Sequence, residues 1–111
     1  MAADEQMKAI ILKAIPQQPP FRFIDELLEL DDDRSIGAYR FRPDEYFYRG
    51  HFPGRPVTPG VILIEAMAQT SIVAHGLYLS MKKSGSSPDD LKRISTLFTC
   101  AEAVEFTGIV A

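Results

Sequence analysis

Two ionisable side chains, His51 and Glu65, stand where each could move a proton. His51 lies on a segment rich in proline and glycine that continues to Gly60. Because proline fixes φ and glycine lets backbones approach closely, this segment would hold an imidazole still enough to act as a base. Glu65 stands within the apolar run 61–68. A carboxyl group in such a run needs a partner and suits the role of a general acid.

A backbone donor and a side-chain amide complete this set of candidate groups. Gly60 is predicted at the start of a helix, where its N–H lacks a helical acceptor and could stabilise charge on an ester or thioester oxygen. A glycine needed only for the turn is an equally good interpretation at this stage. Gln69 follows Glu65 by four residues, so its amide can reach the carboxyl group across one helical turn. A base, an acid and an oxyanion donor support proton chemistry beside a carbonyl, and an enzyme is the leading interpretation.

The other reactive residue types favour structural roles. His75 does not share a helix face with Glu65, which favours packing or a helix-end role. Cys100 has no basic neighbour in sequence; as the single cysteine it excludes an internal disulfide and favours a reducing compartment. The acidic run 31–33 lacks the glycine and distal glutamate of a calcium loop, so a solvated hairpin turn is predicted there. No metal site and no organic cofactor are expected.

Three elements are predicted before the proline- and glycine-rich segment. Apolar residues at helical spacing, acidic residues at the start and Pro16 at the end predict a short helix from residue 4 to about 14, packed on the outside of the domain. Segments 21–30 and 36–42 are rich in apolar and aromatic residues and are predicted to be strands on either side of the acidic turn.

One long helix is predicted from Pro59 to about Lys82, with Thr58 placed to cap it. Nearly every side of this helix is apolar as far as Ala74, a pattern that predicts burial all round. A loop over residues 83–90 and a strand pattern over 94–110 follow. Strands before and after a single buried helix predict an α+β fold, in which an antiparallel sheet wraps around one long central helix.

The whole chain has the composition of a single globular domain over residues 1–111. Its net charge of -3 gives no general attraction for nucleic acid or for an anionic membrane. Acidic residues at positions 4 and 5 precede the first apolar stretch, unlike a signal peptide, and the apolar run 61–68 is too short to span a bilayer. We therefore expect a cytoplasmic protein that binds neither nucleic acid nor membrane.

Residues 51–60 (His-Phe-Pro-Gly-x-Pro-Val-x-Pro-Gly), together with 65–69 (Glu-Ala-Met-Ala-Gln), resemble the signature of the 3-hydroxyacyl-[acyl-carrier-protein] dehydratases of fatty-acid synthesis. A weaker likeness covers residues 20–25. The proline-histidine step usual in that family is replaced by Gln17 and Gln18. The resemblance implies a hotdog fold and a homodimer, or a larger assembly of dimers, in which each active site takes its histidine from one subunit and its acid from the other.

The resemblance also implies a role for each motif residue. His51 would remove the α-proton of a 3-hydroxyacyl thioester carried by acyl carrier protein, and Glu65 would protonate the departing hydroxyl group. The product would be a trans-2-enoyl thioester. The Gly60 N–H would polarise the thioester carbonyl, the Val57 carbonyl would orient the His51 ring, and Gln69 would support Glu65. Glutamate rather than aspartate at the acid position favours dehydration without isomerisation.

The sequence specifies the binding partner and the range of substrates less closely than the reaction. A dock for the carrier protein would need a basic patch, for which the available charges are Arg42, Arg49, Arg55, Lys82, Lys83, Lys92 and Arg93. The size and sequence position of their side chains suggest five residues as the lining of an acyl pocket: Phe47, Tyr48, Ile62, Met67 and Phe98. Fatty-acid synthesis and related lipid or polyketide synthesis are equally compatible with the motif.

Two other functions are considered as alternatives to the dehydratase. One is a hotdog acyl thioesterase, in which the carboxylate activates water. The other is a catalytically inactive acyl-binding or scaffold homologue. Family members continue past residues 106–110 through a proline-glycine-acidic turn into closing strands. The resemblance therefore predicts a C-terminally truncated domain that lacks its C-terminal strands.

Overall fold

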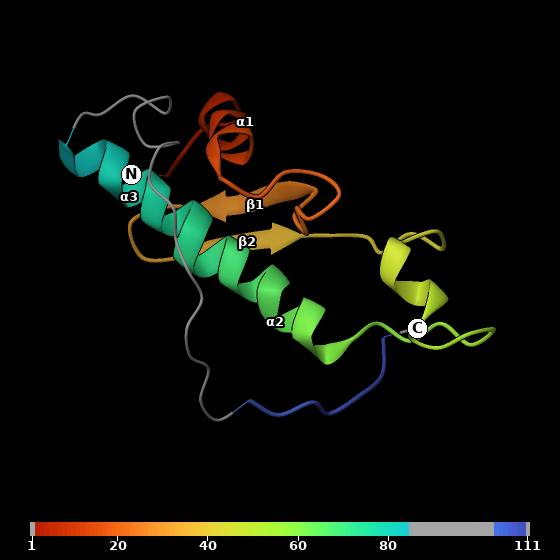
Figure 1. The fold of residues 1–111 in the computed structure, drawn as a ribbon. Coiled ribbons are helices and arrows are strands. Elements are labelled where there is room, and N and C mark those ends of the chain that lie inside the picture. Colours follow the sequence, from red (N-terminus) through yellow and green to blue (C-terminus); the bar gives the residue numbers. More distant parts are fainter. Residues whose placement is uncertain (1, 85–103, 111) are drawn as a thin grey trace.

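A helical rod that runs from residue 60 to residue 84 organises the computed structural model, which describes residues 2–84 and 104–110 (Figure 1). An antiparallel hairpin lies against one side of the rod, and a short N-terminal helix packs on the hairpin. The elements in chain order are α1 (Glu5–Ala14), β1 (Glu26–Leu30), β2 (Ser35–Ala38), the 3₁₀ turn η1 (Tyr46–Arg49), α2 (Gly60–Ala68), the π-helical segment η2 (Gln69–Ala74) and α3 (His75–Ser84).

The N-terminal helix α1 confirms the element predicted from residue 4 to about 14. Asp4 caps it, because its side chain accepts a hydrogen bond of 2.8 Å from the Met7 N–H. The helix ends before Pro16, as the restriction on residues preceding proline requires. Ile11 and Ala14 on its inner face are buried. They contribute to the core rather than merely covering it.

The hairpin β1–β2 pairs Glu26 with Ala38 at its open end and Leu30 with Ser35 beside the turn. In the turn the Asp31 carboxylate accepts hydrogen bonds from the backbone N–H groups of Asp33 and Arg34, at 2.8 and 2.9 Å. The solvated turn is thus confirmed. Over residues 2–84 and 104–110 no group of three potential ligands is placed to hold a metal ion.

Both strands are shorter than the segments 21–30 and 36–42 that were predicted. The Asp25 carboxylate is the physical reason at the open end of the hairpin. It accepts the Arg40 N–H at 2.8 Å and the Arg42 guanidinium at 2.6 Å, which draws the chain after Ala38 out of the ladder. Partial burial raises the pKa of Asp25, but these hydrogen bonds and the charge of Arg42 outweigh it and hold the pKa below its usual range.

The long helix occupies the predicted segment, but two details of that prediction are wrong. Thr58 does not cap the helix: its hydroxyl group bonds the Tyr48 hydroxyl group at 2.6 Å, and Pro59 precedes α2 without a side-chain cap. The helix is also not buried all round among the described residues, since Val61 and Met67 are 72% and 58% exposed. Only one side of the helix packs on the hairpin and α1, through the cluster of Ile11, Ile15, Ile24, Leu27, Leu30, Val73, Ala74 and Tyr78.

The middle of the helix is π-helical, which the sequence did not indicate. Two side chains bond backwards to the preceding turn there: the Thr70 hydroxyl donates to the Ala66 carbonyl at 3.1 Å, and Ser71 to the Met67 carbonyl at 2.8 Å. Strand β2 approaches this turn closely, since a Cβ added to Gly37 would lie 2.9 Å from the Thr70 hydroxyl oxygen. Glycine at position 37 therefore permits the contact.

By length and composition alone, the helix from Gly60 to Lys83 could cross a membrane; the mean hydropathy of its most apolar 18-residue window is 1.4, and 28% of that window is buried. The sequence argument against a membrane-spanning segment considered only the apolar run 61–68, which is shorter than this helix. A core helix of a water-soluble protein has the same properties. The packing on the hairpin and the fully buried, hydrogen-bonded Gln69 favour a core helix here.

The segment from Val104 to Val110 runs beside the N-terminal end of α2 (Figure 1). It meets the loop before that helix, where the Thr58 N–H donates to the Val110 carbonyl at 2.7 Å. The segment is not a strand, so the strand predicted over 94–110 is wrong for this part, because no ladder partner lies beside it among the described residues. The rest of that strand, and residues 85–90 of the predicted loop, lie outside the described residues. The single-domain prediction for 1–111 stays a prediction.

Candidate active site

His51 is held by the loop that its proline and glycine content predicts. The chain turns tightly between Phe52 and Arg55, whose backbones exchange hydrogen bonds of 3.0 and 2.8 Å, and Gly54 supplies a positive φ of 71°. The Val57 N–H then donates to the His51 carbonyl at 3.0 Å, which closes the loop on itself. A short closed loop of this kind restricts the histidine backbone without a regular element.

The imidazole of His51 makes the hydrogen bond that the resemblance implied. Its Nδ1 lies 2.8 Å from the Val57 carbonyl oxygen. A carbonyl can only accept, so Nδ1 carries a proton, and in the neutral form of the ring Nε2 is the nitrogen with a free lone pair. The Phe52 ring stacks on the imidazole at a centroid distance of 4.2 Å. The half-buried ring is therefore fixed in both tautomer and plane.

Glu65 and Gln69 form the second part of the site. The Gln69 side chain is fully buried. Its oxygen accepts the Phe23 N–H at 2.8 Å, and its nitrogen donates to the Phe21 carbonyl at 2.8 Å and to Glu65 Oε2 at 2.7 Å. The two backbone partners dictate which end of the amide faces Glu65. Oε2 is thus held as an acceptor, and a proton for donation belongs on Oε1.

Gly60 is the first residue of α2, as predicted, so its N–H belongs to the turn whose donors have no helical acceptor. The ring of Phe106 lies against this residue: a Cβ added to Gly60 would lie 2.8 Å from Phe106 Cζ. A side chain at position 60 would therefore collide with the ring. The contact gives glycine a packing reason at this position beside the proposed chemical one.

Within the described part of the chain, the His51 half and the Glu65 half of the site are not connected. His51 stands on the loop before α2, and Glu65 lies more than one turn into the helix. No hydrogen bond connects their side chains within residues 2–84 and 104–110. The division of the site between two subunits stays a prediction.

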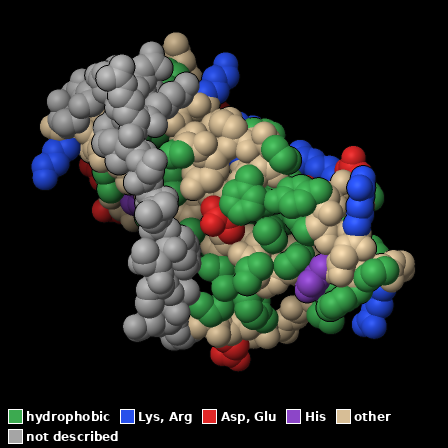
Figure 2. Space-filling model, viewed as in Figure 1, with side chains coloured by type: hydrophobic (Ala, Val, Ile, Leu, Met, Phe, Trp, Pro, Cys, Tyr) green, Lys and Arg blue, Asp and Glu red, His purple; other side chains and the backbone are tan. Residues whose placement is uncertain are grey.

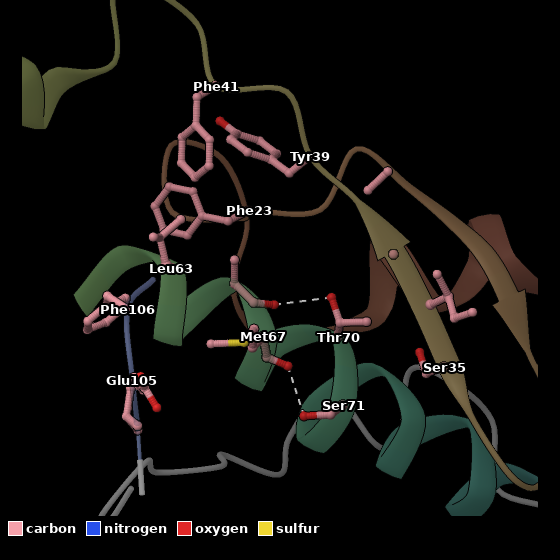
Figure 3. Close-up of a pocket in the computed structure, with 15 residues that line it drawn as sticks. Phe23, Ser35, Tyr39, Phe41, Leu63, Met67, Thr70, Ser71, Glu105 and Phe106 are labelled. Carbon is pink, nitrogen blue, oxygen red and sulfur yellow. Dashed lines mark hydrogen bonds between the residues drawn. The ribbon is translucent and has the colours of Figure 1, made fainter. Parts of the chain in front are cut away.

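A groove of about 760 Å³ runs between β2, the helix and the segment 104–106 (Figure 3). Phe23, Tyr39 and Phe41 stand along one end, Leu63 and Met67 form the helical wall, and Phe106 faces them from the C-terminal segment (Figure 3). Burial, and then the hydrogen bond with Glu45, raise the pKa of Tyr39 to about 12, so its hydroxyl group stays neutral. The groove is mainly apolar; Ser35, Thr70 and Ser71 add hydroxyl groups to its lining, and Glu105 is the charged residue in it.

The groove contains only part of the acyl-pocket lining that was predicted. Met67 lines it, whereas Phe47, Tyr48 and Ile62 do not, and Phe98 lies outside the described residues. Leu63 and Met67 are each two positions from Glu65, so an α-helix places them about 200° away from it. The groove and Glu65 of one chain therefore lie on opposite sides of α2. Figure 2 shows that hydrophobic side chains are common on this face of the molecule. Exposed hydrophobic residues of α2 and of the segment beside it include Val61, Met67 and Phe106.

His75 takes the structural role that was expected. Its Nε2 lies 2.8 Å from the Asp31 carbonyl oxygen, which links the start of α3 to the hairpin turn. Three contacts at the site were not predicted: the Phe21 and Phe23 backbones on Gln69, the Tyr48 hydroxyl on Thr58, and Phe106 on Gly60. The periodicity of Phe21 and Phe23 indicated only a strand.

The comparisons with known proteins agree with the fold and the motif. Residues 15–111 match the FabA-like domain. The chain therefore belongs to the FabA-like family, a family of hotdog folds. This confirms the α+β class, to which the two-stranded antiparallel sheet and long helix also conform.

Curated relatives carry a more specific name, 3-hydroxyacyl-[acyl-carrier-protein] dehydratase FabZ. The protein of Herpetosiphon aurantiacus is 47% identical over 64 residues, which cover 57% of this chain and 45% of the relative. That of Acetivibrio thermocellus is 45% identical over 74 residues, 66% of this chain and 50% of the relative. That of Clostridium botulinum is 46% identical over 65 residues, 58% of this chain and 45% of the relative. The chain spans about half the length of the curated relatives it matches.

Proposed function

We propose that this protein dehydrates 3-hydroxyacyl thioesters to trans-2-enoyl thioesters, with His51 as base and Glu65 as acid. The observation that carries the proposal is the hydrogen bond from His51 Nδ1 to the Val57 carbonyl, which leaves Nε2 as the proton acceptor. The names of the relatives support the same reaction. A thioesterase needs only an activated water, and the fixed histidine tautomer would then have no assigned task.

The proposed reaction uses each fixed group once. Nε2 of His51 takes the α-proton, and the negative charge that develops on the thioester oxygen is stabilised by the Gly60 N–H at the positive end of the helix. The electron pair then forms the α,β double bond as the bond from the β-carbon to its oxygen breaks. Oε1 of Glu65 supplies the proton with which the hydroxyl group leaves as water. Return of a proton from imidazolium to carboxylate restores the resting enzyme.

The two-subunit arrangement also belongs to the proposal. Phe106, which touches Gly60, lines the groove, and the groove lies on the side of α2 opposite the chain's own Glu65. A substrate held in that groove would therefore be served by Glu65 of a second copy. A homodimer, or an assembly of such dimers, supplies that second copy. We further assign the protein to the cytoplasm and to fatty-acid or related lipid or polyketide synthesis, and the names of its relatives support this assignment.

Product analysis tests the reaction. The protein is incubated with 3-hydroxydecanoyl thioester on acyl carrier protein, and enoyl formation and free thiol are followed together. We expect enoyl thioester without thiol release. Thiol release without enoyl product would establish the thioesterase instead, and an absence of both products at saturating substrate would establish the inactive homologue. Addition of the substrate to preformed dimer and to dissociated protein shows whether activity needs the second copy.

Acyl carrier protein is the proposed partner, and the ion pairs narrow the basic residues that could bind it. Arg42 is paired with Asp25, and Lys82 with Asp32. Lys92 and Arg93 lie outside the described residues. Arg49 at the end of η1 and Arg55 on the loop flank His51 in sequence and make no ion pair with another described residue. These two arginines are therefore the leading candidates for contact with an acidic carrier protein.

Charge reversal at both positions, Arg49→Glu with Arg55→Glu, is expected to raise the KM for the carrier-protein thioester roughly tenfold while sparing a small pantetheine thioester. Lys83→Glu is the matched control, because Lys83 lies in the last turn of α3, about 35 Å along the helix from Gly60. Equal effects on the two substrates, or an equal effect of Lys83→Glu, would refute docking at the histidine loop.

A further inference from the structure

Phe106 is the residue whose position the proposed reaction does not yet use. Its ring lies on Gly60, where Cζ and Cε2 would be 2.8 and 3.0 Å from an added Cβ. The same ring also forms part of the wall of the apolar groove, opposite Leu63 and Met67 (Figure 3). It therefore stands at the boundary between the start of α2 and the groove.

The backbone that follows the ring is bonded to the loop that precedes α2. The Val110 carbonyl accepts the Thr58 N–H at 2.7 Å, and Thr58 is itself buried and bonded to Tyr48. Phe106 is nevertheless 51% exposed, so its ring has one covered side, against Gly60, and one open side. A half-exposed aromatic ring with an anchored backbone can contact a ligand while the chain that bears it stays in place.

The distances place this ring beside the reacting end of a substrate. A thioester oxygen bound to the Gly60 N–H would lie about 3 Å from that nitrogen, and its carbonyl carbon about 1.2 Å further. The α-carbon is bonded to that carbonyl carbon. It therefore lies within about 6 Å of the Gly60 nitrogen, and the ring touches the same glycine from its Cβ side, which makes the two close neighbours. A substituent on the α-carbon would compete with the ring for space.

We propose that Phe106 is a specificity-determining residue that admits unbranched 3-hydroxyacyl thioesters and excludes those with a methyl branch at the α-carbon. The inference rests on the proposed function, since it takes the Gly60 N–H to bind the thioester oxygen. Its chemistry is steric: close packing leaves no volume for the branch while the ring is present. A single methyl group at such a site changes discrimination roughly 10- to 200-fold.

Binding of unreactive analogues tests the proposal without turnover. The probes are pantetheine amides of 3-hydroxyhexanoic acid and of 2-methyl-3-hydroxyhexanoic acid, whose Kd values are measured by calorimetry on the whole protein. Phe106→Ala is expected to improve the affinity for the branched amide relative to the unbranched one by roughly tenfold or more. Phe106→Tyr keeps the ring and is expected to keep the wild-type ratio. Ile109→Ala, an exposed apolar residue of the same segment, is the matched control.

The possible outcomes separate this inference from the function on which it rests. A ratio for Phe106→Ala within threefold of the wild type would overturn the filter, as would an equal change in Ile109→Ala. Melting temperatures of the variants show that each is folded. Dehydration of the unbranched substrate is measured separately on the wild-type protein, so its absence would count against the proposed function alone. If neither the wild type nor Phe106→Ala binds either amide, both the proposed filter and the proposed function are contradicted.

Discussion

Replacement of His51 by alanine is expected to lower kcat for dehydration roughly 10²- to 10⁴-fold, the usual contribution of a positioned general base. The reason is the fixed tautomer: with Nδ1 donating to Val57, Nε2 is the ring atom that takes the α-proton. His51→Asn sharpens the test, because an asparagine amide can still donate to the Val57 carbonyl but cannot accept a proton at neutral pH. The loop can then keep its closed form while the base is lost.

The second histidine provides the matched control for this prediction. His75 also bonds a backbone carbonyl, that of Asp31, but it lies where the helix meets the hairpin turn. His75→Asn is therefore expected to keep kcat within about twofold and to change stability at most modestly. Rates are measured as enoyl formation at saturating substrate, beside a melting curve for each variant. Similar losses of kcat in the two asparagine variants would contradict the assignment of His51 as base.

Local signals predicted the elements well where the interacting residues are close in sequence. The cap at Asp4, the stop before Pro16 and the Asp31 turn each depend on partners within a few residues. The two hydrogen bonds implied at the site are local as well: His51 with Val57 spans six residues, and Glu65 with Gln69 spans four. Such contacts follow from loop closure and helix geometry, so a motif with fixed spacing specifies them.

Contacts between distant segments were not visible in the sequence. Phe23 and Gln69 are 46 residues apart, and nothing in the hydrophobic pattern indicates that a glutamine amide would bond the backbone of the segment before β1. Likewise, the apolar surface of the long helix indicated burial on every side. Within the described residues, however, the hairpin and α1 cover only one side of it. Periodicity reports which surfaces are apolar, but the partner that covers each surface is a property of the whole fold or of its assembly.

Replacement of Gln69 by leucine is expected to lower the free energy of unfolding by about 3–5 kcal/mol. Leucine leaves the buried Phe23 N–H without its acceptor, which costs about 1–3 kcal/mol, and removes the partly buried bond to the Phe21 carbonyl, which is worth about 0.5–1.5 kcal/mol more. Loss of the bond to Glu65 adds to this cost. Since small domains are stable by only about 5–15 kcal/mol, the variant should lose much of its resistance to urea.

Gln18→Leu is the control that separates burial from hydrogen bonding. Gln18 also makes short hydrogen bonds to backbone carbonyls, those of Leu12 and Ile15 at 3.0 and 2.9 Å, but it is exposed to solvent. Water can replace its amide, so a loss of about 1 kcal/mol or less is expected. A loss in Gln69→Leu no larger than in Gln18→Leu would contradict the anchoring role. If the large loss is found, the amide that orients Glu65 also fixes the helix to the Phe21–Phe23 backbone, because the same two backbone bonds determine which end of that amide the carboxyl group meets.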